Sequence, residues 1–337
     1  MRTGLIGFMS AIGAGLAVAS LFPVDVAGQG AAARAATTTP ASALRTPWGD
    51  PDLQGAWTNT TTTPFERLPE VPDKAVLTET ERVEVARKVD ERINQDRPRP
   101  GQVVPYNDFW YERGTLSNRT ALIIDPPEGK LPPMTPQGQQ RLDALAASRK
   151  AHPADSWLDR SPSDRCITRS MPGAMMPGFY NHNYRILQTP GYVTILVEMI
   201  HDARIIPLDG RPHLQEPVRQ WLGDSRGRWE GSTLVVETTN FNDKAFENGL
   251  VTRGFGGNQR MVERFTRVGA NAIDYQFTIE DPTTFTKPWT VSAPMAKMDD
   301  PLYEYACHEG NYALSGILGG ARADEKAAAE AAQKQPR

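Results

Sequence analysis

The sequence predicts a mainly β fold, in which an antiparallel β-barrel carries a helical and irregular layer on its N-terminal side. From Tyr184 onward, short apolar or alternating segments follow one another at close spacing. Turn-forming pairs such as Pro190-Gly191 and Asp209-Gly210 separate them, and no helix-like segment lies between them. Strands that follow one another without crossover helices pair antiparallel, and closing such a sheet into a barrel removes its exposed edges.

Residues 1–30 predict a secretory signal peptide. A basic second residue precedes an apolar stretch from Leu5 to Phe22, and small residues follow it. This order is typical of a signal that is cleaved, here between Ala27 and Ala36. The apolar stretch is almost long enough to span a bilayer, so a membrane anchor is the alternative. Its many Gly, Ala and Ser residues favour cleavage, and we expect a periplasmic or secreted protein without stable membrane insertion.

The rest of the chain divides into three parts. Residues 31–46 are small and polar, which predicts a linker. Residues 47–320 predict a single domain, in which a helix and loop layer at 65–180 precedes the strands of the barrel. Residues 321–337 are rich in Ala, Glu and Lys without an apolar stripe, which predicts a disordered or helical tail.

The layer contains two expected helices and one short strand. Thr78 stands three residues before Glu81, which is the spacing of a capping box, and apolar residues then recur at helical spacing. A second helix is expected to open near Thr135, and residues 121–124 predict a strand. Proline is dense throughout, so we expect irregular connections laid over the barrel.

The expected barrel strands alternate in polarity. In "STLVVETTNF", Thr233 and Glu237 share one face, and Leu234 and Val236 share the other. The charges of "ERFTR", which begins at Glu263, are expected to face solvent. The strand segments are YRILQTP, YVTILVEMI, ARIIPLD, DSRGRWEG, STLVVETTNF, MVERFTRV, AIDYQFTIED, WTVSAPM and LYEYACHE.

The only two cysteines, Cys166 and Cys307, predict one disulfide in an exported protein. The bond would close a loop of about 140 residues, which the chain-entropy model values at roughly 4–5 kcal/mol. A nucleophilic thiol or a metal ligand is the alternative.

Composition and missing motifs exclude several functions. The net charge of −3 comes from interspersed acids and bases, so no basic face attracts nucleic acid. There is no phosphate loop, nucleotide fingerprint, Gly-x-Ser-x-Gly elbow or haem motif, so we expect no cofactor. The histidines lack metal-ligand spacing, and a metal site would have to be assembled from His201, His213 and His308.

Residues 193–213 concentrate ionisable groups beside apolar strand segments. Two strands turning near "HDA" would bring Glu198 and Arg204 together across the pair. A buried charge requires a partner. Either the two residues form a salt bridge in the barrel wall, or they lie at the floor of a cavity. There Arg204 would hold a substrate oxygen and Glu198 would act as a base.

Other ionisable groups are expected at the same pocket. Arg211 and His213 project from a loop at the barrel mouth, and His308 and Glu309 follow the disulfide. A structural polar network would explain these residues nearly as well. The expected catalytic residues are Glu198, His201, Arg204, His213, His308 and Glu309, and the expected substrate-binding residues are Asn183, Tyr184, Asp202, Arg211 and Trp110.

Several motifs resemble known proteins. Gly55 and Trp57 form a Gly-x-Trp element, which resembles the opening of lipocalin-like (calycin) barrels. The chain also resembles a family of exported proteins of soil and aquatic bacteria. That resemblance implies export and a single domain, and it rests on PWGDPDLQGAW, RTALIIDPPEGKLPP, DRCI, QTPGYVTILVE, RIIPLDGRPH, GDSRGRWEGSTLVVETTNF, ERFTR, EDPTTFTKPWT and YEYACHEGN.

These patterns favour an enzyme that acts on a small organic molecule, such as a glycosidic or aromatic compound, in the barrel mouth. The expected chemistry is cofactor-free acid/base catalysis, as elimination, isomerisation or hydrolysis. The alternative is a non-catalytic barrel protein that binds a small ligand.

Overall fold

A computed structural model describes residues 44–71, 73–97, 106–245 and 257–334. The described residues belong to one compact unit, Thr38–Arg337. The expected signal peptide and most of the expected linker lie outside the described residues. No helix among the described residues is both long and apolar enough to cross a membrane.

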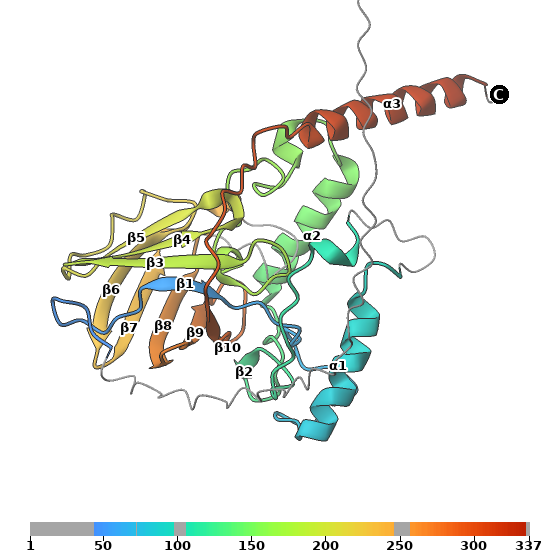
Figure 1. Ribbon diagram of the computed structural model, residues 1–337. Helices are drawn as coiled ribbons and strands as arrows, with labels where there is room; N and C mark the ends of the chain where they lie inside the picture. The colour runs from blue at the N-terminus through green and yellow to red at the C-terminus, as the bar shows by residue number, and fades with distance from the viewer. Residues whose placement is uncertain (1–43, 72, 98–105, 246–256, 335–337) are drawn as a thin grey trace, which may run out of the picture. The chain divides into compact units, whose positions relative to one another are not determined.

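The described strands form one mainly antiparallel sheet (Figure 1). Its order is β5-β4-β3-β1-β11-β9-β8-β7-β6, and β10 pairs with both β9 and β2. The strands are β1 (Gly55–Thr58), β2 (Ile123–Asp125), β3 (Asn183–Thr189), β4 (Tyr192–Val197), β5 (Ala203–Pro207), β6 (Asp224–Glu230), β7 (Thr233–Thr239), β8 (Arg260–Gly269), β9 (Ala272–Glu280), β10 (Trp289–Ser292) and β11 (Met295–Met298).

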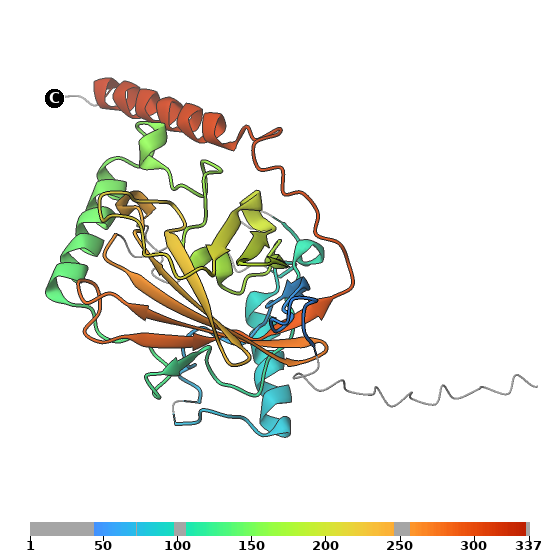
Figure 2. The same ribbon diagram turned by 90° about the vertical axis from the view of Figure 1, so that its left-hand side faces the viewer.

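The sheet is open, so the predicted closed barrel is not confirmed. It curls until its edge strands β5 and β6 approach each other (Figures 1 and 2), but no ladder joins them within the described residues. Every neighbouring pair between these edges is antiparallel and the path holds nine strands, so β5 and β6 run in the same direction. Direct closure would therefore require a parallel ladder.

Side chains bridge the edges of β5 and β6 where backbone hydrogen bonds do not. The Arg204 guanidinium lies 3.5 Å from the Ser225 hydroxyl. Further along, Gly227 leaves room for the side chains of Ile206 and Leu208, which a Cβ at that position would meet at 2.8 and 2.6 Å. We call this contact line between β5 and β6 the seam.

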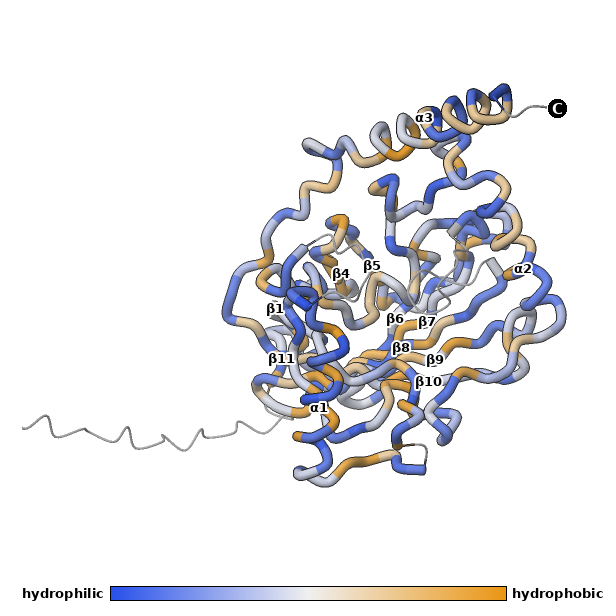
Figure 3. The backbone as a smooth tube through the Cα atoms, turned by 90° about the vertical axis from the view of Figure 1, so that its right-hand side faces the viewer, coloured by the Kyte–Doolittle hydropathy of each residue, from blue (hydrophilic) through white to orange (hydrophobic). Residues whose placement is uncertain are grey.

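Large apolar side chains fill the concave side of the sheet. Along β9 every second residue is buried, as the alternation of its sequence predicts. Phe265 of β8 stacks on Tyr275 of β9 with ring centroids 4.6 Å apart. Figure 3 shows the hydrophobic stretches of β8 and β9. The predicted alternation therefore locates the core.

The layer before the sheet contains two of the three α-helices found in the described part of the chain. α1 (Glu79–Ile93) begins with the predicted capping box of Thr78 and Glu81. α2 (Pro136–Ala151) begins after Thr135, whose hydroxyl donates to the carbonyl of Thr283 at 2.7 Å and so fastens the helix beside β9. The remaining helices are α3 (Ala313–Lys334), η2 (Asp108–Trp110), η3 (Trp157–Asp159), η4 (Gly173–Met175), η5 (Met199–His201) and η6 (Asp243–Ala245).

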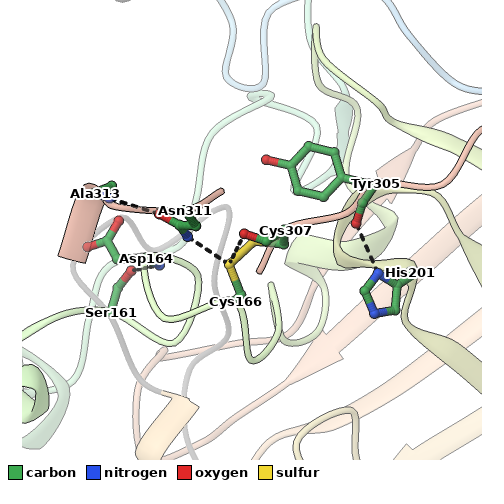
Figure 4. The surroundings of a disulfide bond; sticks show 8 residues. All are labelled: Ser161, Asp164, Cys166, His201, Tyr305, Cys307, Asn311 and Ala313. Carbon is green, nitrogen blue, oxygen red and sulfur yellow. Dashed lines mark hydrogen bonds between the residues drawn. A yellow bond between two sulfur atoms is a disulfide. The ribbon is translucent and has the colours of Figure 1, made fainter. Parts of the chain in front are cut away.

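The predicted disulfide between Cys166 and Cys307 is confirmed, with Cα atoms 5.7 Å apart. It fastens residues 299–312, the irregular segment between β11 and α3, to the layer before the sheet (Figure 4). We call residues 299–312 the C-terminal strap.

Candidate functional site

Two of the predicted site residues meet at one end of the β3–β4 hairpin. The ladder pairs Tyr184 with Val197, so Asn183 and Glu198 stand opposite each other just beyond it. The Asn183 amide donates to Glu198 Oε2 at 2.8 Å. Glu198 Oε1 accepts from the backbone N–H of Tyr303 in the C-terminal strap at 3.2 Å. Both oxygens of this buried carboxylate are therefore hydrogen-bonded.

A second carboxylate shares the amide of Asn183. Asn183 Nδ2 lies 3.2 Å from Glu112 Oε2 and 2.8 Å from Glu198 Oε2. The two carboxylate oxygens are thus at most 6.0 Å apart, the sum of these distances. Glu112 is exposed, and its backbone N–H donates to the carbonyl of Phe179 at 2.8 Å. One carboxylate of the pair is open to solvent and the other is enclosed.

Aromatic residues are close to this carboxylate pair in the sequence, since Trp110 is two residues from Glu112 and Tyr180 is three residues from Asn183. Tyr106 stacks on Tyr180 at 5.9 Å and packs against Trp110 at 6.5 Å. Tyr180 meets the edge of Tyr305 from the C-terminal strap, and Phe109 meets Trp110. Phe109 is 82% exposed and Trp110 is 55% exposed. We call these five residues the aromatic face.

His201 contacts the backbone of the C-terminal strap rather than the rings of the aromatic face. Its Nδ1 lies 3.0 Å from the carbonyl oxygen of Tyr305, and a carbonyl can only accept, so Nδ1 is the donor of this hydrogen bond. Figure 4 shows the imidazole and the Tyr305 ring pointing away from each other. His201 and the preceding Ile200 both have positive φ, at 48° and 63°. This strained turn places the exposed imidazole away from the aromatic face.

The predicted contact between Glu198 and Arg204 is wrong. Arg204 pairs with Ile195 in the β4–β5 ladder, whereas Glu198 lies beyond the end of β4. Arg204 instead points into the interior, where it forms an ion pair with Glu263 of β8 and donates to Oε1 at 2.9 Å. Tyr275 donates to the same oxygen at 2.9 Å. Glu263, which we expected at the surface, is therefore wholly buried.

Electrostatics fix the charges of this buried group. Burial alone would lower the pKa of Arg204, but the charge and hydrogen bonds of Glu263 outweigh it and raise the pKa. Burial raises the pKa of Tyr275 further, and the Glu263 carboxylate adds to that effect. Arg204 is thus committed to an internal ion pair, which makes it a structural group rather than an open oxyanion partner.

A cleft of about 540 Å³ follows the seam between β5 and β6. Consecutive residues of both strands line it, so their edges form its walls. Asp202 belongs to this lining and accepts from the Thr168 hydroxyl at 2.9 Å. Burial raises the pKa of Asp202. Asp202 therefore belongs to the cleft along the seam and is not one of the five residues of the aromatic face.

The remaining predicted residues lie elsewhere. His213 contacts Asp224 at 2.9 Å and Glu237 at 3.5 Å. Glu237 lies on the face of β7 opposite to the buried Val236, so His213 is on the outer side of the sheet. Arg211 is exposed and pairs with Asp209 within its own turn.

Tyr184 is in the core, where its hydroxyl donates to Asn59 at 3.2 Å and burial raises its pKa. His308 and Glu309 are exposed beside Cys307. Among the described residues, no side-chain hydrogen bond or ion pair joins any of these three residues to the carboxylate pair, so the predicted convergence on one pocket is not confirmed.

Sequence reasoning missed Glu112 and most of the aromatic face. The segment "YNDFWYERG", from Tyr106 to Gly114, does contain a signal, because four aromatic residues and a Glu stand close together without an apolar strand or helix to bury them. Within the described residues, no group of three or more His, Cys, Asp or Glu side chains could hold a metal ion. A comparison with protein families, curated proteins and solved structures found no match for the chain.

Proposed function

We propose that this protein binds a glycoside on the aromatic face, outside the cytoplasm. The observation that carries the proposal is the row of exposed rings, led by Phe109 and Trp110, on the same chain segments as the Glu112–Asn183 pair. A sugar ring has an apolar face of C–H groups that packs on aromatic rings, and hydroxyls that donate to carboxylates. Two neighbouring carboxylates disfavour an anionic ligand.

The exposure of these rings is itself an argument for a ligand. Contiguous exposed apolar surface on a protein marks a binding site more often than isolated residues do. Tyr180 connects the two parts of the aromatic face, because its ring contacts both Tyr106 and Tyr305. Since Tyr305 belongs to the disulfide-fastened C-terminal strap, the rings are held in place before a ligand arrives.

Export belongs to the same proposal. The Cys166–Cys307 bond supports it, because disulfides persist in oxidising compartments. The signal-like pattern of residues 1–30 supports it too. Sequencing the N-terminus of protein recovered from the periplasm or the medium tests it, and a start between residues 28 and 37 is expected.

The binding experiment measures tryptophan fluorescence and heat of binding with a panel of neutral glycosides. Covering roughly 60 Å² of apolar ring surface contributes about 1.5 kcal/mol, so Trp110→Ala is expected to weaken binding about tenfold. Trp157→Ala is the matched control, because Trp157 is 50% exposed but lies on η3, outside the aromatic face. Equal affinity of both variants and the wild type would refute the proposed face.

Catalysis is the second candidate function, and one distance favours it. Glu112 and Glu198 lie at most 6.0 Å apart, and retaining glycosidases place their two carboxyl groups about 5–5.5 Å apart. Exposed Glu112 would exchange protons with the glycosidic oxygen, and enclosed Glu198 would face the sugar carbon. This arrangement uses cofactor-free acid/base chemistry.

A turnover assay separates the enzyme from the carrier. Wild type is incubated with the glycosides that it binds, and the products are followed by mass spectrometry. The enzyme hypothesis expects Glu112→Gln to abolish product formation while binding persists. Binding by the wild type without conversion of any ligand would instead identify a carrier.

A further inference from the structure

A second pocket, of about 270 Å³, lies where the chain leaves β1 and meets the corner between β10 and β11. Its walls come from residues 58–63, 115–119 and 292–296, and none of the five residues of the aromatic face lines it. Most of its polar groups are hydroxyls, from Thr58, Thr60, Thr61, Thr63, Thr115, Ser117 and Ser292.

Some hydroxyl protons of this pocket have no acceptor among the described residues. A hydroxyl donates once and accepts twice. The Thr63 hydroxyl donates to Ser117 Oγ at 3.0 Å, and the backbone N–H of Arg119 donates to the same oxygen at 3.1 Å. Among the described residues, no group accepts the proton of Ser117. The Thr58 and Thr60 hydroxyls share one contact at 3.1 Å, which occupies only one of their two protons.

Two further donors of the pocket have no partner in the described part of the protein. Ser292 is only 1% exposed, yet its hydroxyl makes no hydrogen bond to any described residue. The guanidinium of Arg119 likewise has neither an ion pair nor a hydrogen bond within the described part of the chain. Arg119 is exposed, and its guanidinium offers five donors and a fixed charge.

No carboxylate is among the described residues that line the pocket. The site therefore offers unpaired donors and one positive charge, while its acceptors are all neutral oxygens. A group that accepts hydrogen bonds and carries negative charge fits this lining. We propose that this pocket binds a small oxyanion, either inorganic phosphate or sulfate or the carboxylate of a small organic acid.

The proposal explains the polarity of "TNTTTT", residues 58–63, which begins at the last residue of β1. Threonines at this density are unnecessary for a turn, but their hydroxyls line one wall of the pocket. Charge-assisted hydrogen bonds to an oxyanion are stronger than those between neutral groups. Arg119 would supply such a bond at the rim, and Ser292 would supply a neutral one at the floor.

Calorimetric titration of the full protein with phosphate, sulfate and acetate at constant ionic strength tests the pocket. Saturable binding of at least one anion, with a Kd of about 1 mM or tighter, is expected. Arg119→Gln should weaken it at least tenfold, because it removes the charge-assisted contact. Ser292→Ala should weaken it by a smaller factor without changing the far-ultraviolet circular dichroism.

Two control variants show whether anion binding depends on this pocket. Arg185→Gln removes an exposed arginine of β3 that has no ion pair within the described residues, and it should leave anion binding unchanged. Trp110→Ala should also leave it unchanged, so failure of the glycoside proposal would not affect this result. No saturable binding of any anion would overturn the proposal. Equal weakening by Arg185→Gln, or none by Arg119→Gln and Ser292→Ala, would overturn it too.

Discussion

Replacing Glu263 by leucine breaks the buried ion pair with Arg204 inside the curled sheet and tests its contribution to stability. The side chains of Arg204 and Glu263 are 1% and 0% exposed. In the variant, the guanidinium stays in the interior without an opposing charge, and the Tyr275 hydroxyl loses its acceptor. Breaking a buried pair from one side costs about 3–5 kcal/mol, and an orphaned buried hydroxyl adds about 1 kcal/mol.

This loss is large relative to the free energy of unfolding of a typical domain, about 5–15 kcal/mol. Equilibrium unfolding in urea, followed by tryptophan fluorescence and circular dichroism, measures it. Glu230→Leu is the matched control, because Glu230 also contacts arginines but is exposed at the end of β6. That variant should change the midpoint little.

A double variant tests the physical reason. Arg204→Met combined with Glu263→Leu removes both charges and fills the space with apolar side chains. Replacement of a whole buried pair is often neutral or stabilising, so the double variant should be more stable than Glu263→Leu alone. A double variant that loses the sum of the two single effects would refute the reasoning, as would a nearly unchanged Glu263→Leu protein.

Three further changes have defined outcomes. Burial, with a smaller contribution from Arg169, lowers the pKa of His182 from 6.5 to about 3. Below pH 6.5 the unfolded chain therefore binds a proton at His182 that the native protein does not, and the free energy of unfolding falls by roughly 1 kcal/mol per pH unit as the pH decreases. His182→Gln should flatten the measured dependence of the unfolding free energy on pH between 6 and 4. An unchanged slope would contradict this. Replacing both cysteines by alanine should lower the free energy of unfolding in urea by about 2–5 kcal/mol. It should also detach the C-terminal strap, which spectroscopy would report as loss of the contact between Tyr305 and Tyr180. An unshifted urea midpoint would argue against this prediction. Thr78→Ala removes the capping box of α1 and should cost about 1 kcal/mol, seen as faster amide exchange in the first turn of the helix but not in β9.

Local patterns predicted much of the fold. The alternation of β9, the capping box at Thr78 and the pairing of the only two cysteines each depend on a short segment or on a simple count. Closure of the sheet depends on how many strands join the path and in which direction they run. β1 pairs with both β3 and β11, and no short segment specifies that arrangement.

The site was predictable only in part, for a related reason. Asn183 and Glu198 were both predicted as site residues, but their pairing across one hairpin was not predicted. Glu112 meets Asn183 from 71 residues away, through packing of the layer against the sheet. The burial of Glu263 did carry a sequence signal. Glu263 is two residues from both Met261 and Phe265, so in a strand it shares their buried face. Its partner Arg204 is 59 residues away, and its identity required the curl of the whole sheet.

The seam leaves two strand borders whose amides and carbonyls are available to other chains, and such borders invite association between molecules. The sequence protects both. β5 ends at Pro207, which has no N–H to donate, and β6 carries Arg226, Arg228 and Glu230, whose charges resist a docking strand. The protection of both borders therefore rests on one proline and three charged side chains.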